Sequence, residues 1–305
     1  MTLAFADGPL YFPVTAYAAD GGVDLDVTAE VIARTLEHSP GGVFPACGTG
    51  EFHALSAEES LSVLRVAVET VAGRVPVVAG VGGAVGQAVA AVRALETIGA
   101  DGVLLLPPYL VGSSQEGLIR YVTAVAEASA LPVIVYHRGT ARYEAATFAR
   151  LVAEQPTVAG FKDGIGDIAL AHEIVLAARR VREDVQFFNG LLTAEASQAA
   201  YRAIGIPLYS SAAFAMAPQI ANAYYRAYSD GDDEACRRLL ESFYHPLITL
   251  RDTTPGYAVS LIKTGLRLGG SPVGGVRAPL TDPGEEHTAR LREILAAGER
   301  ILSHA

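Results

Sequence analysis

Eight short, almost wholly apolar runs recur along the chain, and they constrain its fold more than any other feature. A strand with one face in water alternates apolar and polar residues, whereas a strand buried on both faces is apolar throughout. The runs therefore indicate the strands of a parallel sheet that is covered on both faces. They are LYFPVT (10–15), GGVFPA (41–46), VPVVAG (75–80), GVLLLP (102–107), LPVIVY (131–136), TVAGFK (157–162), VQFFNG (185–190) and IPLYSS (206–211).

Segments with helical periodicity separate these runs, including 57–73, 85–100, 114–130 and 145–155. The first of them opens with Ser56 followed by Glu59, which is the spacing of a capping box. Eight strand–helix units with right-handed crossovers close naturally into a (β/α)8 TIM barrel. The alternative is an open doubly wound sheet, which commonly has fewer strands.

Further helical patterns follow the eighth run, at 232–252, 256–269 and 285–302. Together these segments contain more residues than the single helix that follows the last strand of a barrel. We therefore predict an α/β fold with a barrel over 1–230 and a C-terminal helical extension over 231–305. No linker divides the sequence, so we expect the extension to pack on the barrel as one structural unit.

Charge and cysteine content exclude several classes of function. The 33 acidic and 23 basic residues give a net charge of −10 without any basic stripe, which argues against a nucleic-acid partner. The two cysteines, Cys47 and Cys236, lie far apart in sequence, as is typical of a protein from a reducing compartment. Neither a signal peptide nor an apolar run of roughly 18 residues is present, so we expect a soluble cytoplasmic protein with no membrane partner.

Lys162 ends the sixth apolar run, and the active sites of barrels lie at the C-terminal ends of their strands. Burial disfavours an ammonium and lowers its pKa from about 10.4. A partly neutral lysine attacks carbonyl carbons. The alternative, equally open from position alone, is a lysine at the end of a strand that reaches solvent.

Tyr136 ends the fifth run, which neighbours the sixth in a barrel, so Tyr136 and Lys162 can face each other. A phenol at that position can move protons to and from a carbinolamine. Arg138 lies two residues further on and points the same way if the strand continues, where it can bind a carboxylate. The alternatives are an aromatic residue that only packs at the end of the barrel and a solvated arginine.

Gly48, Thr49 and Gly50 follow the second run and indicate a tight turn ahead of the next helix. Glycines allow backbone N–H groups to approach an anion closely, and Thr49 adds a hydroxyl donor. We expect this turn to receive a carboxylate and Glu51 to play a structural part. A plain strand-to-helix turn is the alternative.

Other signals do not support a cofactor or a metal. AGVGGAVGQ (79–87) lacks the spacing of a dinucleotide-binding loop, and the seven histidines show no metal-ligand spacing. We expect His53 and His137 to be bystanders and Cys47 to be a small buried residue. DGGVDLD (20–26) indicates a turn followed by a helix cap.

Strings in nearly every part of the chain resemble the pyruvate-type class I aldolase family of dihydrodipicolinate synthase and N-acetylneuraminate lyase. Within it, the chain looks closest to the dehydratases that act on 5-dehydro-4-deoxyglucarate. The long strings around Gly48 and Lys162 are specific. The strings are FPVT (12–15), GGVFPACGTGEFHAL (41–55), LLPPYL (105–110), PVIVYHR (132–138), GFKDGIGD (160–167), FFNGL (187–191), PLYSSA (207–212), PGYAVSLIK (255–263) and VRAPL (276–280).

The resemblance implies a role for each matching position. Lys162 forms an imine with a 2-oxo acid, Tyr136 moves protons, and Thr49 with the Gly48–Gly50 turn holds the carboxylate. Asn189, Ser210 and Ser211 are implied as further substrate contacts. The family's enzymes form homotetramers or dimers and need neither a metal nor an organic cofactor.

Two departures from the family pattern bear on the reaction. The synthases carry two threonines where this chain has Gly48 and Thr49, and two adjacent tyrosines where it has Tyr109 and Leu110. The missing tyrosine breaks a proton relay and argues against the synthase reaction. The resemblance then implies a decarboxylating hydro-lyase of sugar-diacid catabolism that makes 2,5-dioxopentanoate, water and CO2.

Two other functions remain open at this stage. An aldolase of 2-keto-3-deoxy sugar acids would use the same imine and release pyruvate. A non-catalytic oxo-acid-binding protein would keep the carboxylate turn but would not require Lys162 and Tyr136 together.

Overall fold

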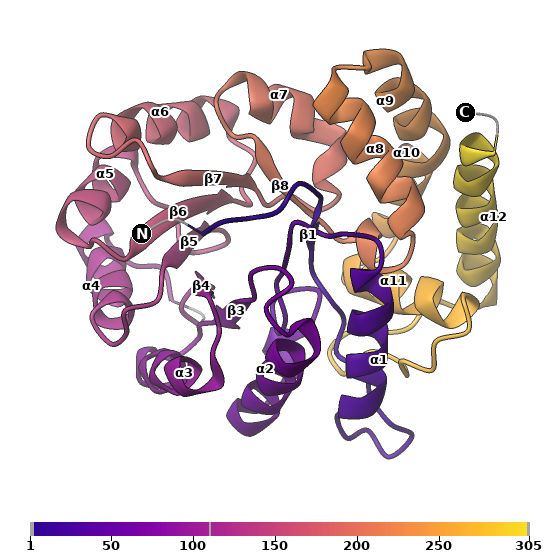
Figure 1. The fold of residues 1–305 in the computed structure, drawn as a ribbon, viewed down its shortest axis with the longest axis horizontal. Helices are drawn as coiled ribbons and strands as arrows, with labels where there is room; N and C mark the ends of the chain where they lie inside the picture. Colours follow the sequence, from indigo (N-terminus) through magenta and orange to yellow (C-terminus); the bar gives the residue numbers. More distant parts are fainter. Residues whose placement is uncertain (1–2, 110, 304–305) are drawn as a thin grey trace. The chain divides into compact units, whose positions relative to one another are not determined.

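A computed structural model describes residues 3–109 and 111–303 of the chain, and each predicted apolar run contributes a strand (Figure 1). The strands are short, because only part of each run takes part in the sheet ladder. This confirms the eight predicted strands. They are β1 (Leu10–Tyr11), β2 (Gly42–Val43), β3 (Val78–Val81), β4 (Gly102–Leu105), β5 (Val133–His137), β6 (Val158–Asp163), β7 (Gln186–Asn189) and β8 (Leu208–Ser211).

Helices alternate with the strands, as the periodicity predicts. The Ser56–Glu59 capping box is present at the start of α2, and Asp24 caps α1. The α-helices of this part are α1 (Leu25–Leu36), α2 (Ala57–Val71), α3 (Val85–Ile98), α4 (Gln115–Ala126), α5 (Ala145–Glu154), α6 (Ile168–Arg179), α7 (Gln198–Ala203) and α8 (Pro218–Asp230). Short 3-10 turns lie at Phe52–Ala54, Ala194–Ser197 and Ala213–Ala215.

The chain falls into two compact units, each made of more than one segment of the sequence. One holds Pro76–Ser210 with the N-terminal residues as far as Phe5, and the other holds Ala6–Val75 with the chain from Ser211 onward. The C-terminal extension therefore groups with the first β/α units. Lys263 and the backbone N–H of Arg277, both in this extension, bond to the Glu51 carboxylate, a pairing that no local pattern reveals.

In the first unit, strands β3 to β8 pair in chain order and all run parallel. One face of this sheet packs against its helices, where Phe148 of α5 contacts Phe161 and Phe187 at ring-centroid distances of 4.8 and 6.5 Å. Successive side chains of a strand point to opposite faces. The residues next to Phe161, including Lys162, therefore lie on the face away from these helices.

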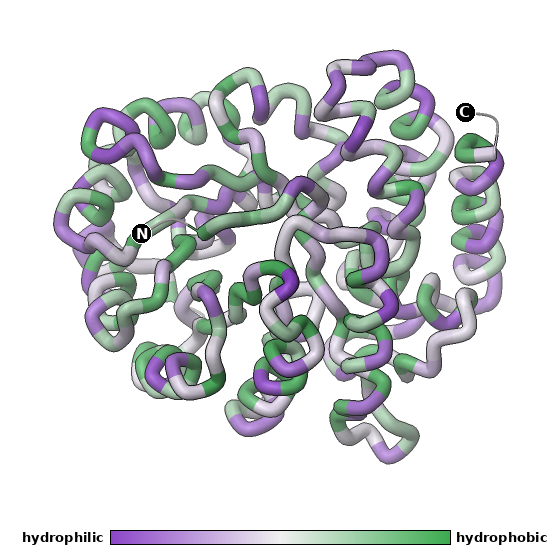
Figure 2. The backbone as a smooth tube through the Cα atoms, in the orientation of Figure 1, coloured by the Kyte–Doolittle hydropathy of each residue, from purple (hydrophilic) through white to green (hydrophobic). Residues whose placement is uncertain are grey.

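In the second unit, β1 and β2 pair in parallel and α1 packs against α2. The predicted C-terminal helices are present as α9 (Asp233–Leu239), α10 (His245–Arg251), α11 (Tyr257–Leu268) and α12 (Glu285–Leu302). A π-helical turn, Leu240–Tyr244, joins α9 to α10 just before Pro246, which has no N–H for a regular helical bond. Hydrophobic and hydrophilic residues alternate along α12, whose apolar side packs on α8, α10 and α11 (Figure 2).

Among the residues that the structure describes, no helix is both long enough and apolar enough to cross a membrane.

Candidate active site

Lys162 lies on β6 at a position set by the sheet register. Its Cα is paired with Tyr136 on β5 and with Phe188 on β7, so the three side chains share the face that the helices do not cover. The lysine is only 5 % exposed and the tyrosine 6 %. The alternative of a lysine reaching out to solvent is therefore excluded by its burial.

The structure brings Lys162, Tyr136 and Arg138 together, as the sequence predicts. The Nζ of Lys162 lies 4.5 Å from the centre of the Tyr136 ring. The Tyr136 hydroxyl donates to the carbonyl of Gly190 at 2.9 Å and accepts from Nη1 of Arg138 at 2.8 Å. A guanidinium donor at a phenol oxygen stabilises negative charge there, which suits a group that gives up and regains a proton.

Two glycines that the sequence reading missed make room for this cluster. A Cβ at Gly190 would lie 2.6 Å from Cε of Lys162, and a Cβ at Gly164 would lie 2.8 Å from the Tyr136 ring. Neither glycine has a positive φ, so both are needed for space rather than for backbone conformation. A signal was present in the sequence, because Gly190 directly follows Asn189 and Gly164 lies two residues after Lys162.

The opposite face of the same strands carries buried polar residues with structural roles. His137 accepts a hydrogen bond from the Tyr143 N–H at Nδ1, and burial lowers its pKa below the usual range, with Asp163 opposing the shift. The Asp163 carboxylate accepts from the N–H groups of Ile165 and Gly166 and from the Tyr201 hydroxyl. His137 is thus a buried neutral residue outside the lysine cluster, in line with its reading as a bystander.

Asn189 also lies on this opposite face, since its Cα pairs with Asp163. Its amide nitrogen is within bonding distance of Ala194 O, Ser197 Oγ and Gln198 Oε1, and its amide oxygen accepts from the Leu191 N–H. The side chain holds the loop after β7 together. Its geometry does not favour the suggested substrate contact, because its polar atoms already have partners within that loop.

The two adjacent serines of β8 lie on opposite faces of the sheet, because successive side chains of a strand alternate between the faces. Ser210 lies two residues beyond Leu208, which pairs with Phe188, so it shares the face of Lys162; its hydroxyl donates to the Asn189 carbonyl at 3.3 Å. Ser211 is fully buried and its hydroxyl accepts from the Phe214 N–H at 3.2 Å, at the 3-10 turn that follows β8. Ser210 remains a candidate for substrate contact, whereas Ser211 caps a turn.

In the second unit, residues Gly48–Gly50 form the predicted turn after β2. The Glu51 N–H donates to the Gly48 carbonyl, and the Thr15 hydroxyl donates to the Gly50 carbonyl at 2.7 Å. Gly50 is required by close approach, since a Cβ there would lie 3.0 Å from the Ala46 nitrogen. The left-handed positions are instead Ala46 and Glu51, with φ of 51° and 58°. Non-glycine residues in that region are strained and mark functional loops.

The structural role predicted for Glu51 is confirmed. Its carboxylate is fully buried and accepts from the Arg277 N–H at 2.8 Å and from Nζ of Lys263 at 2.8 Å. Cys47 is buried, as expected of a packing residue, and His53 is exposed. The departure noted at Leu110 lies outside the described residues.

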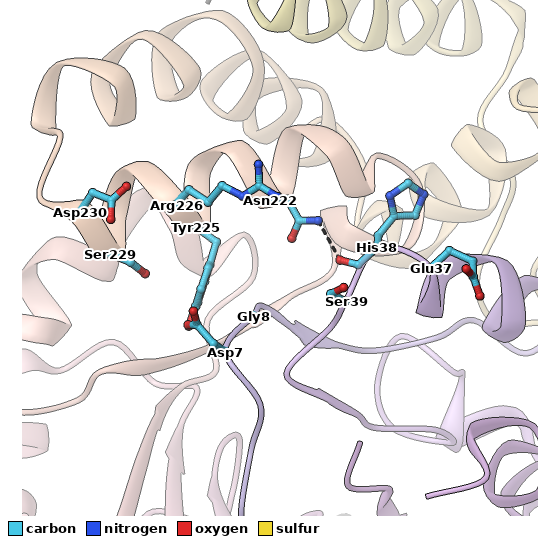
Figure 3. Close-up of a pocket in the computed structure, with 10 residues that line it drawn as sticks. All are labelled: Asp7, Gly8, Glu37, His38, Ser39, Asn222, Tyr225, Arg226, Ser229 and Asp230. Atoms are coloured by element: carbon cyan, nitrogen blue, oxygen red, sulfur yellow. Dashed lines mark hydrogen bonds between the residues drawn. The ribbon is translucent and has the colours of Figure 1, made fainter. Parts of the chain in front are cut away.

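Within 3–109 and 111–303, no three His, Cys, Asp or Glu side chains lie close enough to hold a metal ion. A cavity of about 380 Å³ lies in the second unit between α8 and the residues after α1 (Figure 3). Its polar groups bond one another, as Asn222 does to the His38 carbonyl and Tyr225 to Asp7, and no predicted site residue lines it.

Comparison with known proteins places the chain in a family. The model of the dihydrodipicolinate synthetase family matches residues 6–298. The chain belongs to this family. It is 50 % identical over 302 residues to a probable 5-dehydro-4-deoxyglucarate dehydratase 1 of Streptomyces coelicolor, covering 98 % of this chain and 95 % of that protein. It is 41 % identical over 277 residues to the 5-dehydro-4-deoxyglucarate dehydratase of Pseudomonas putida, covering 91 % and 90 %.

Solved structures of the family share the fold. Dihydrodipicolinate synthase from Bacillus clausii has a TM-score of 0.88 at 26 % identity, covering 96 % of this chain and 98 % of that one. YagE from E. coli K12, solved in complex with pyruvate, has a TM-score of 0.85 at 26 % identity with the same coverage. The predicted fold class, a (β/α)8 barrel followed by C-terminal helices, is confirmed.

Proposed function

We propose that the chain is a decarboxylating hydro-lyase that converts 5-dehydro-4-deoxyglucarate into 2,5-dioxopentanoate, water and CO2 through an imine on Lys162. One observation carries the chemistry, namely the buried Lys162 amine beside the Tyr136 ring, whose hydroxyl accepts from Arg138. The names of the relatives at 41–50 % identity support the substrate.

Imine formation is the first step. The neutral amine of Lys162 attacks the ketone carbon, and the resulting carbinolamine loses its hydroxyl as water when Tyr136 supplies a proton. The face of an aromatic ring attracts a positive charge placed over it. The Tyr136 ring therefore favours the protonated imine as well as supplying the proton donor.

Dehydration and decarboxylation both follow from the same electron sink. The protonated imine acidifies the adjacent CH2, and loss of a proton there expels the β-hydroxyl as water, which leaves a carbon–carbon double bond conjugated to the imine. The electrons of the bond to the distal carboxylate can then flow into this conjugated system, and CO2 leaves. The enol that results becomes the aldehyde, and water releases 2,5-dioxopentanoate from Lys162.

The two carboxylates of the substrate need separate donors. In this proposal the hydroxyl of Thr49 and the backbone N–H groups of the Gly48–Gly50 turn hold the carboxylate next to the ketone. Arg138 receives the distal carboxylate, since a guanidinium matches a carboxylate with two parallel hydrogen bonds. Ser210 assists at the hydroxyl that departs. These local donors offset the overall negative charge of the chain.

The lysine supplies the electron sink, so the proposal requires neither a metal nor an organic cofactor. We further propose that the protein works in the cytoplasm, in the catabolism of sugar diacids, as a homotetramer or dimer. We expect the protein to retain full activity after dialysis against a chelator.

The reaction is tested by incubating the protein with 5-dehydro-4-deoxyglucarate and following CO2 and the semialdehyde together. The proposal predicts that both form in equal amounts and that no pyruvate appears in a lactate dehydrogenase-coupled assay. Release of pyruvate in place of CO2 would instead establish the aldolase reaction. Thermal stabilisation by the 2-oxo acid without any turnover would indicate a binding protein.

A further inference from the structure

Besides Lys162, the chain contains one other lysine, Lys263, and it is buried inside α11. Its side chain is fully buried and so is that of its partner, Glu51, at an Nζ–Oε1 distance of 2.8 Å. Nζ also donates to the Gly275 carbonyl at 2.6 Å and lies 3.8 Å from the centre of the Tyr17 ring. The ammonium is thus buried against three protein groups, which is the environment of a structural ion pair rather than of a reactive amine.

The other carboxylate oxygen of Glu51 connects to a second ion pair. Oε2 accepts from the backbone N–H of Arg277, whose guanidinium donates to Glu59 at 2.6 and 2.9 Å and to the Ala54 carbonyl at 2.9 Å. Glu59 in turn closes the capping box of α2 with Ser56. Lys263 and Arg277 thus bond to three positions of the segment 51–59, namely Glu51, Ala54 and Glu59.

This network reaches the carboxylate-binding turn through one residue. Glu51 directly follows Gly50 and adopts a left-handed conformation, φ 58°, that a glutamate rarely adopts. Its N–H also closes the turn by donating to the Gly48 carbonyl. A buried ion pair costs desolvation energy that hydrophobic residues would avoid, so its presence needs a reason other than stability. Holding a strained backbone is such a reason.

We propose that Glu51 and Lys263 are positioning residues, whose ion pair keeps the Gly48–Thr49–Gly50 turn in the conformation that receives the carboxylate of the 2-oxo acid. The inference rests on the proposed function, because it assigns to that turn the binding of the substrate. It adds that Lys263, which is 212 residues away in sequence from its partner Glu51, controls substrate affinity.

The same contacts predict a pH dependence of that affinity. Burial lowers the pKa of Lys263 to about 8, against the opposing effects of Glu51 and Asp282, while Arg267 lowers it further. Tyr17 also faces the ammonium, and Arg277 lies on the same ring at 4.3 Å. As pH rises through about 8 the lysine loses its charge, and the buried Glu51 carboxylate loses the ammonium to which it is bonded. The turn then loosens, and KM for the 2-oxo acid rises as pH passes through 8.

The test measures the concentration of pyruvate that gives half-maximal borohydride trapping on Lys162, at pH 7 and at pH 9. In the native protein we expect this concentration to rise several-fold between the two values. In the paired neutral variant Glu51→Gln/Lys263→Met, we expect the half-maximal pyruvate concentration at pH 7 to be about tenfold higher or more, since small displacements of binding groups have large effects. We expect this concentration to change little between pH 7 and pH 9. The maximal extent of trapping should be retained.

Two controls separate positioning from simple loss of stability. The paired variant leaves no uncompensated buried charge, so it should fold even if Lys263→Met alone does not. Leu291→Ala opens a cavity in α12, where Leu291 is fully buried, and should lower Tm without changing the pyruvate concentration needed. We expect the paired variant to have a higher Tm than Lys263→Met alone, because Glu51→Gln removes the unpaired charge. We expect its affinity for pyruvate to remain as low as that of the single variant.

The possible outcomes are distinguishable. If the native protein is not trapped at any pyruvate concentration, the proposed imine chemistry fails. If it is trapped, but with the same half-maximal concentration at pH 7 and 9 and in the folded paired variant, the imine chemistry stands and the positioning role is overturned.

Discussion

The strand ends around Lys162 and the turn around Thr49 are held in place by different forces. Lys162 and Tyr136 are carried by neighbouring parallel strands, in a register fixed by backbone hydrogen bonds, and the missing side chains of Gly164 and Gly190 leave them space. The turn has no such ladder, and we propose that the buried ion pair next to it holds it in place. We infer that damage to the strand ends lowers kcat, whereas damage to the turn raises KM.

Tyr136→Phe tests the strand-end region with the largest effect. The variant keeps the ring beside Lys162 but removes the hydroxyl, so the loss reports the proton transfer and the hydrogen bonds that the hydroxyl makes. We expect kcat to fall by about 10²–10⁴-fold, the usual contribution of a general acid–base group, with a smaller change in KM. Steady-state kinetics measure it. A change in KM with an unchanged kcat would contradict the proposed role.

Gly190→Ala tests whether the space beside Lys162 matters. The added methyl group would lie 2.6 Å from Cε of Lys162, which forces the amine to move. Misplacement by about 1 Å costs roughly 10²-fold in rate, so we expect a loss of that order in kcat. Gly86→Ala is the matched control, because a Cβ at Gly86 on α3 meets no atom within 4 Å. An unchanged kcat in Gly190→Ala would disprove the spatial argument.

Thr49→Val tests the turn. The substitution keeps the shape of the side chain but removes its hydroxyl, and hydrogen bonds to charged groups contribute about 1.5–3 kcal/mol. We expect KM to rise by about 10–100-fold with kcat changed far less, and Thr49→Ser to restore most of the affinity. If kcat falls and KM stays constant, the division between the two regions does not hold.

Glu59→Gln tests the outer part of the network that holds the turn. Its hydrogen bonds with Arg277 lower the pKa of the Glu59 carboxyl to about 2. Because the pKa is lower in the folded protein, the stabilisation is present above pH 4.5 and is lost as pH falls from 4.5 toward 2. We expect the variant to lose about 1 kcal/mol or less at pH 7 and to show a shallower fall of Tm over that acid range.

Thermal melts between pH 2.5 and 7 measure this difference. Glu293→Gln, which breaks an exposed ion pair with Arg290 on α12, is the control and should behave like the native protein. Parallel acid profiles for native protein and Glu59→Gln would show that the Arg277 pair does not stabilise the fold.

The strands and the two principal site residues were predictable because their signals are local. A lysine and a tyrosine at the ends of two successive apolar runs can be located from the sequence, and a barrel brings such ends together. The face on which a residue lies depends on the register between strands, which a single sequence does not show. A shift of one residue reverses the face, so the suggestion from the family resemblance that Asn189 and Ser211 contact the substrate could not be checked against their faces from the sequence alone.

The network behind the turn was not predictable for another reason. Glu51 looked structural, but its partners Lys263 and Arg277 lie 212 and 226 residues away. Contacts over such separations depend on how helices pack, and no periodicity within α11 marks Lys263 as the partner. The clue in the sequence was a lysine that follows two large apolar residues within a helical segment, VSLIKTGL (259–266).

The most direct test of the central claim is borohydride reduction in the presence of 5-dehydro-4-deoxyglucarate, followed by mass spectrometry of the lysine-containing peptides. The chain has only two lysines, so the site of an adduct is unambiguous. We predict a covalent adduct on Lys162 and none on Lys263, with loss of activity in proportion to the modification. Turnover of the substrate without any adduct, or an adduct on Lys263 instead, would contradict the account.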